Sequence, residues 1–142
     1  MNVLFDTNVI LDVMLDRLPF SEPASHLLSV AEYGRIKGHI CATTVTTIHY
    51  LATKSLGKNK ARDHIKNLMT LFDIAPVNRG VIEDALKSPF TDFEDSVIYH
   101  SAYHSGIEAI VTRGAKGFKK SALPVYNPVE MLIILDAMEP PH

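Results

Sequence analysis

The chain opens with an apolar run that ends on a carboxylate. Val3, Leu4 and Phe5 are followed directly by Asp6, and a helix pattern begins straight after it, at residues 7–15. A short continuous apolar run is typical of a strand that is covered on both faces of its sheet. Asp6 is therefore placed at the carboxyl end of the first strand. In open α/β sheets this edge is where ligands bind, because strand ends and helix N-termini line a crevice there.

Short strand patterns and helix patterns alternate along the rest of the chain. Further strands are predicted at residues 39–42, 73–77, 108–112 and 125–127, and the clearest amphipathic helix is predicted at residues 58–72. Two helices are expected to start at capping residues, one at Ser21 and one at Thr43 or Thr44. Regular alternation of this kind predicts an α/β fold with a mainly parallel sheet.

Length and composition restrict the cellular setting. A chain of 142 residues favours a single domain, residues 1–142, and we expect residues 137–142 to be a frayed tail. The lone cysteine, Cys41, excludes an internal disulfide and suits a reducing cytoplasm. No apolar run approaches the length of a membrane span, so a cytoplasmic protein without a membrane partner is expected. The net charge of −2 means that binding to a polyanion would be local and would need cations.

A second pair of acids stands at the start of a predicted helix. Asp92 and Asp95 are three residues apart, so their side chains project to one side of the first turn. Taken alone, acids in a first turn are best explained by the helix dipole. This helix, however, leads into the strand at residues 108–112, so its start belongs at the same edge of the sheet as Asp6. Asp6 and Asp95 are therefore expected to face each other across the crevice.

Carboxylates that share a partly dry crevice repel each other unless a proton or a cation is bound. Oxygen ligands of this kind suit Mg²⁺ or Mn²⁺, which keep several waters and bind substrate phosphates. A divalent ion there can activate a water and neutralise charge on a phosphodiester. The residues thus predict metal-assisted hydrolysis of a phosphodiester.

Several spaced motifs then follow in a recognisable order. They are Asp6-Thr7-Asn8-Val9-Ile10-Leu11-Asp12, Asp16-Arg17 with Pro19-Phe20, Asp92-Phe93-Glu94-Asp95, Ile110-Val111-Thr112-Arg113, and Leu123-Pro124-Val125. Together they resemble the PIN-domain family of ribonucleases, and most closely its bacterial and archaeal branch, which includes the VapC-type toxins. The resemblance runs from residue 2 to about residue 132.

The resemblance implies a three-layer sandwich with a parallel sheet of four or five strands flanked by helices. It also implies a Mg²⁺- or Mn²⁺-dependent endoribonuclease that cleaves single-stranded RNA, often as a homodimer, and that a small antitoxin blocks. Carried over by position, Asp6 and Asp95 are catalytic metal ligands and Asp92 is an additional acid of the same site. Asn8 and Thr112 match polar positions that line the same pocket.

The chain departs from the family pattern at three positions. Thr47 stands where a glutamate is usual, and Gly114 and Gly117 occupy the loop that commonly carries an acid or asparagine. Threonine can hold a metal-bound water but adds no charge, so we expect weaker metal binding than in a four-acid site.

Two clusters outside the acidic motifs have more than one interpretation. Four cations follow the strand at residues 108–112, and they either steer phosphates or belong to an ordinary solvated loop; they are Arg113, Lys116, Lys119 and Lys120. His100 and His104 have a spacing that can chelate zinc, but at 100° per residue they point away from Asp95. Solvated or interface histidines are the favoured interpretation of that pair.

Three functional hypotheses follow. The leading one is a toxin-type metal-dependent ribonuclease that uses Asp6, Asp92 and Asp95. The second is a degenerate PIN module that binds RNA or a protein partner without cutting, which Thr47, Gly114 and Gly117 favour. The third, a phosphatase of the haloacid-dehalogenase type, requires an aspartate at the position of Asn8 and is therefore disfavoured.

Overall fold

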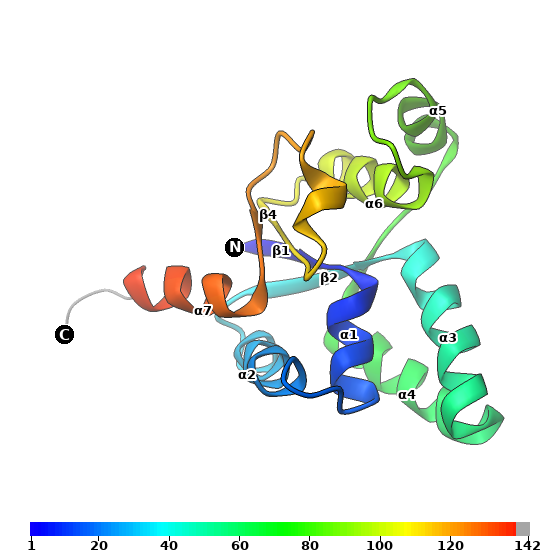
Figure 1. The fold of residues 1–142 in the computed structure, drawn as a ribbon, viewed down its shortest axis with the longest axis vertical. Coiled ribbons are helices and arrows are strands. Elements are labelled where there is room, and N and C mark those ends of the chain that lie inside the picture. Colours follow the sequence, from blue (N-terminus) through cyan, green and yellow to red (C-terminus); the bar gives the residue numbers. More distant parts are fainter. Residues whose placement is uncertain (139–142) are drawn as a thin grey trace.

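The computed structural model, which describes residues 1–138, places its five strands in one parallel sheet (Figure 1). In spatial order the strands are β3 (Asp73–Ala75), β2 (Lys37–Cys41), β1 (Asn2–Phe5), β4 (Ala109–Val111) and β5 (Val125–Tyr126). β1 is central and pairs in parallel with β2 on one side and β4 on the other. The predicted α/β fold with a parallel sheet is confirmed.

Helices cover both faces of this sheet. They are α1 (Thr7–Met14), α2 (Ser21–Glu32), α3 (Ala42–Leu56), α4 (Lys58–Leu71), α5 (Arg79–Lys87), α6 (Phe93–His104) and α7 (Pro128–Ala137), with a 3-10 helix at Ala115–Phe118. Figure 1 shows α1 to α4 and α7 on one side of the strands and α5 and α6 on the other. No helix within residues 1–138 is long and apolar enough to cross a membrane.

The side chains of β1 show why the sheet must be covered twice. Val3 and Phe5 point into an apolar cluster with residues of α1, α2 and α7, whereas Leu4 points into a second cluster with Ile98 of α6. All three β1 side chains are fully buried. Successive side chains of a strand point to opposite faces, so an unbroken apolar run needs apolar partners above and below. The three-layer arrangement follows from this requirement.

Two predicted helix caps were wrong. α2 begins at Ser21 itself, with Phe20 in the N-cap position, and α3 begins at Ala42, directly after β2. The hydroxyl of Thr44 is fully buried and hydrogen-bonded to the hydroxyl of Thr7 across 2.9 Å. It joins α3 to α1 instead of capping its own helix, a tertiary role that local sequence does not reveal.

The end of the chain also differs from expectation. α7 starts with a capping box between Asn127 and Glu130 and extends through Ala137. Ala137 of the predicted tail is therefore helical, and Met138 follows it as the C-cap residue. The remaining residues of the predicted tail, 139–142, lie outside the described residues.

Candidate functional site

Asp6 stands between the last residue of β1 and the first turn of α1. Its Oδ1 accepts a hydrogen bond from the Thr7 amide (2.8 Å), and its Oδ2 accepts one from the Thr112 hydroxyl (2.8 Å). The Asp6 amide donates to the carbonyl of Val111 (2.9 Å), which continues the pairing of β1 with β4 by one residue. Asp6 is only 6% exposed, and this burial raises the pKa of its carboxyl, although the two hydrogen bonds oppose the rise.

Thr112 organises the polar groups around Asp6. Its buried hydroxyl donates to Asp6 and accepts from the Gly114 amide (2.9 Å) and from the Asn8 side-chain amide (3.4 Å). The Asn8 Oδ1 accepts in turn from the Arg113 amide (3.2 Å). Thr112 thus contacts Asp6 directly, and Asn8 is linked to Asp6 through Thr112.

Asp92 and Asp95 both lie at the start of α6. Asp92 is the N-cap residue, and its Oδ1 accepts a hydrogen bond from the Asp95 amide (2.9 Å), so the capping interpretation describes part of its role. Asp95 is half-buried. Burial and then repulsion from Asp6, Asp92 and Glu94 raise the pKa of Asp95 to about 6. Asp95 therefore lies close enough to Asp6 for the charge of Asp6 to act on it.

The acidic groups fit a hydrated divalent ion and do not form a closed metal cage. Within residues 1–138, no three His, Cys, Asp or Glu side chains are grouped so that they could hold a metal ion by themselves. Mg²⁺ is commonly held by one or two carboxylates together with water and substrate phosphate. Asp6 and Asp95 supply oxygens with free lone pairs and an unbalanced negative charge, which suits that mode of binding.

Thr47 is not hydrogen-bonded to these acids in the part of the chain that the structure describes. Its hydroxyl donates to the Thr43 carbonyl (3.1 Å) within α3. The side chain faces a cavity of about 280 Å³ between α3, α5 and α6, lined by Thr43, Thr46, Thr47, Ile82, Phe93, Glu94 and Val97. Glu94 is the one acid on this wall. A carboxylate is therefore near Thr47, but α6 supplies it, and α3 does not.

The two glycines of the loop after β4 have different surroundings. A Cβ at Gly117 would overlap the Oδ2 of Asp95 and lie 3.1 Å from its Cγ, so a side chain at 117 has no room while Asp95 stays in place. A Cβ at Gly114 would come no closer than 3.7 Å to Asn8 and Thr112, which is ordinary contact. Gly117 lets the loop lie directly against the Asp95 carboxylate, whereas Gly114 leaves space.

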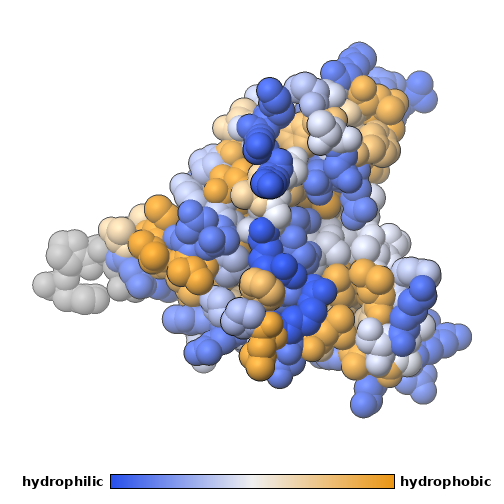
Figure 2. Space-filling view, in the orientation of Figure 1, coloured by the Kyte–Doolittle hydropathy of each residue, from blue (hydrophilic) through white to orange (hydrophobic). Residues whose placement is uncertain are grey.

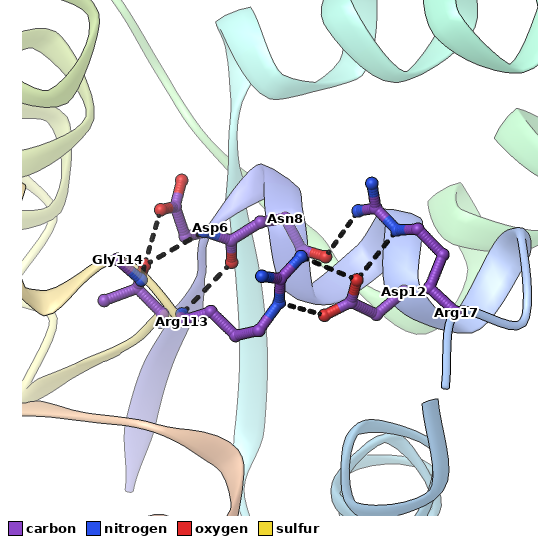
Figure 3. A network of polar contacts seen from close by, with 7 residues as sticks. Asp6, Asn8, Asp12, Arg17, Arg113 and Gly114 are labelled. Atoms are coloured by element: carbon purple, nitrogen blue, oxygen red, sulfur yellow. Dashed lines mark hydrogen bonds and ion pairs between the residues drawn. The ribbon is translucent and has the colours of Figure 1, made fainter. Parts of the chain in front are cut away.

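A buried carboxylate that the sequence did not single out joins the loop to α1. Asp12 is 1% exposed and contacts two arginines: its Oδ1 lies 2.8 Å from the Arg17 Nε, and its Oδ2 accepts from the Arg113 Nε at 2.6 Å. Figure 3 shows the two guanidinium groups on either side of this carboxylate. An acid inside the apolar helix pattern of residues 9–15 was the available signal.

The same network determines where Arg113 points. Its guanidinium makes a second hydrogen bond to Asp12, from Nη2 (3.0 Å), and lies 4.0 Å from the centre of the Phe20 ring. Only its backbone amide reaches Asn8 and so the polar groups around Asp6. The side chain of Arg113 ties the loop after β4 to α1, and a role for it in steering phosphates stays a prediction.

The histidine pair lies apart from these groups. His104 Nε2 contacts Asp84 of α5 at 2.6 Å, and the ring of His100 packs edge-on against Tyr99 with 4.9 Å between centroids. His104 therefore joins α6 to α5, whereas His100 packs on a residue of its own helix.

Comparison with known proteins identifies the family of the chain. A model of the PIN domain family matches residues 2–116. The chain belongs to the PIN domain family. Ribonuclease VapC1 of Aquifex aeolicus (strain VF5) is 26% identical to this member over 118 residues, which cover 78% of this chain and 79% of the relative.

Solved structures share the fold of this PIN domain. FitAcB from Neisseria gonorrhoeae aligns with a TM-score of 0.67 and 21% identity, over 89% of this chain and 98% of the other. DNA-bound VapBC from Salmonella typhimurium aligns with a TM-score of 0.68 and 14% identity, over 90% of this chain and 98% of the other. These similarities confirm the predicted PIN-type sandwich.

We predict that Asp12→Asn destabilises the protein. Removing one partner of a buried ion pair typically costs about 3–5 kcal/mol, but water can reach both arginines here, so we expect a loss of about 2 kcal/mol in the free energy of unfolding. Urea unfolding measures it. Asp73→Asn, which breaks the exposed pair with Lys37 (3.0 Å), is the matched control and should change little. Equal, small effects of the two substitutions would contradict a structural role for Asp12.

Asp95 gives the metal-free protein a pH-dependent stability. Its pKa in the folded chain is about 6, above the ordinary 3.8, so the folded protein binds this proton more tightly than the unfolded chain does. The resulting stabilisation is complete below the ordinary value and is lost as the pH rises through 6. In chelator, Asp95→Asn should therefore melt at a higher temperature than the native protein at pH 7.5, and the difference should shrink towards pH 4. A difference that is the same at both pH values would exclude this explanation.

Proposed function

We propose that this PIN domain is a Mg²⁺- or Mn²⁺-dependent endoribonuclease that cleaves single-stranded RNA. The observation that carries the proposal is the position of two carboxylates at the carboxyl edge of the sheet. Asp6 is buried there and has no cationic partner among residues 1–138, and Asp95, at the start of α6, lies close enough for the Asp6 charge to raise its pKa. Unbalanced carboxylates at the switch point of an open sheet are the ligands that a hard divalent ion requires.

Each residue of the site has a definite part in this proposal. Asp6 and Asp95 would hold the ion, which when bound supplies an activated water and neutralises charge on the phosphodiester. The Thr112 hydroxyl fixes the orientation of the Asp6 carboxylate through its 2.8 Å hydrogen bond. Asp92 accepts the Asp95 amide, which holds Asp95 at the first turn of α6, and adds negative charge to the site.

We further propose that the protein is the toxin of a toxin–antitoxin pair. The similarity to Ribonuclease VapC1 and to chains from a toxin–antitoxin complex of Klebsiella pneumoniae supports this role. We propose that the protein acts on its RNA substrate in the cytoplasm.

Exposed apolar side chains support the proposal that this chain binds other proteins. Leu18, in the turn between α1 and α2, is 77% exposed, and Tyr50 of α3 is 58% exposed. On α7, Val129 and Ile133 are 51% and 62% exposed, and Figure 2 shows the apolar surface over this helix. Apolar groups gathered on a surface often mark interaction sites. We propose a small antitoxin and a second copy of the chain as the partners.

One observation favours a second candidate function, a PIN module that binds RNA or a protein without cleavage. No three-acid cluster is present among the described residues, and Thr47 provides no carboxylate from α3. A site with fewer charges binds a divalent ion less tightly. A chain that kept the fold and lost catalysis would have this composition.

Cleavage assays separate the two candidates. Purified protein incubated with single-stranded RNA should cleave in Mn²⁺ or Mg²⁺ and not in chelator. Asp95→Asn should reduce the rate by more than about 100-fold, because losing a ligand should cost at least as much as losing a residue that supports one. Cleavage that survives chelator or the substitution would exclude the metal mechanism. RNA binding without cleavage under any condition would favour the second candidate.

The Gly117 contact gives a further prediction. Gly117→Ala should force the Asp95 carboxylate to rotate away and weaken Mn²⁺ binding, measured by calorimetry, while stability changes little because Asp95 is only half-buried. Gly114→Ala is the matched control and should bind Mn²⁺ like the native protein, since its Cβ meets no atom closer than 3.7 Å. Equal Mn²⁺ affinities for the two variants would mean that Asp95 is not a ligand.

A further inference from the structure

The loop after β4 and the segments around it form the most one-sided charged stretch near the site. Residues 109–129 hold four cations and no acid, in a chain whose net charge is −2. Arg113 is already paired with Asp12. Lys116, Lys119 and Lys120 are exposed, and none of them has an ion-pair partner within residues 1–138. The three lysines are the cations left available to a polyanion here.

These lysines share one pocket. It has a volume of about 220 Å³ and lies between the 3-10 helix and the segment that leads into α6. Besides the three lysines, it is lined by Pro89, Phe90, Thr91 and Gly117. Phe90 stacks on Tyr99 with 4.9 Å between ring centroids and meets Phe118 edge-on at 6.1 Å. Phe118 is itself 3% exposed. The aromatic packing fixes both walls of the pocket, so the lysines extend from an anchored framework.

Gly117 connects this lysine pocket to the acidic site. One side of Gly117 lines the pocket, and the space where its side chain would be is occupied by the Asp95 carboxylate. The negative and the positive regions are thus separated by the width of one backbone segment. A strand held with one phosphate at Asp6 and Asp95 would bring a neighbouring phosphate to the lysines.

We propose that the lysine pocket binds a phosphate of the RNA strand next to the phosphodiester that is cleaved. This inference rests on the proposed function. The acidic site repels a polyanion, so binding requires cations close by, and unpaired lysines gain most because they release counterions from the strand. Lysine binds phosphate as a point charge and needs no fixed geometry, which suits exposed side chains on a short loop. The phosphate is either an internal diester or a 5′-terminal group, since both carry the same charge chemistry.

The test measures binding separately from cleavage. A fluorescent 12-nucleotide single-stranded RNA is titrated with protein in Ca²⁺ and in chelator, and anisotropy is followed over a range of salt. The triple variant Lys116→Gln, Lys119→Gln, Lys120→Gln should bind about tenfold more weakly than the native protein at 0.1 M salt. The slope of log affinity against log salt should fall by about 2, at roughly 0.7 for each lost phosphate contact.

The matched control removes three exposed lysines of α4. Lys58→Gln, Lys60→Gln, Lys66→Gln makes the same change in net charge and should alter affinity by less than about threefold. Equal losses in the two triple variants, no loss in either, or no RNA binding by the native protein would overturn the proposal. If the first triple variant melts at a lower temperature than the native protein, the three single variants replace it.

Comparing binding with cleavage shows whether the lysine pocket or the proposed nuclease activity is wrong, and comparing two RNA ends shows which phosphate is bound. Lysine-dependent binding without any cleavage in Mn²⁺ would retain the pocket and reject the proposed nuclease. Cleavage in Mn²⁺ at the native rate and native KM by the triple variant would retain the nuclease and reject the pocket. Oligonucleotides with and without a 5′-phosphate distinguish the sources, because only a terminal site loses its lysine dependence when the 5′-phosphate is absent.

Discussion

The pairing of β1 with β4 is the constraint on which the site depends. The two strands run parallel at the centre of the sheet and end together, and the Asp6 amide extends their ladder by bonding to the Val111 carbonyl. The residue after each strand is therefore fixed beside the other, Asp6 on one side and Thr112 on the other. From β1 the chain continues to β2 and β3 on one side of the sheet, and from β4 it continues to β5 on the other side. The strand order therefore reverses between β1 and β4, which is where a crevice forms in an open α/β sheet.

Two buried aspartates six residues apart show how differently the chain treats a carboxylate. Asp12 is balanced by two arginines, and its role is to join α1, the turn that follows it and the loop after β4. Among residues 1–138, Asp6 receives hydrogen bonds only from the neutral groups of Thr7 and Thr112, and burial raises its pKa. Leaving a buried charge unbalanced costs stability, and such groups are concentrated where a ligand supplies the missing charge. This contrast is why we assign Asp12 a structural role and propose a functional one for Asp6.

The sequence predicted what depends on local pattern. An apolar run ending on Asp6 and an acid-rich helix start at Asp92 and Asp95 were enough to place three carboxylates at one edge of a parallel sheet. It missed what depends on tertiary contact: the hydrogen bond between Thr44 and Thr7, and the ion pair between Asp12 and Arg113. The partners in these two contacts are 37 and 101 residues apart, and a pattern along the chain does not reveal such contacts.

Gly117, in the loop after β4, lies between the acidic site and the lysine pocket. An acid at position 117 would compete with Asp95 for the same space and would add negative charge beside three lysines. With glycine there, no acid is among the residues that line the lysine pocket. A polyanion is repelled by each additional carboxylate and attracted by each unpaired cation. If the site acts as we propose, glycine at position 117 therefore weakens the hold on a metal ion and strengthens the hold on RNA, and these two expected effects on catalysis oppose each other.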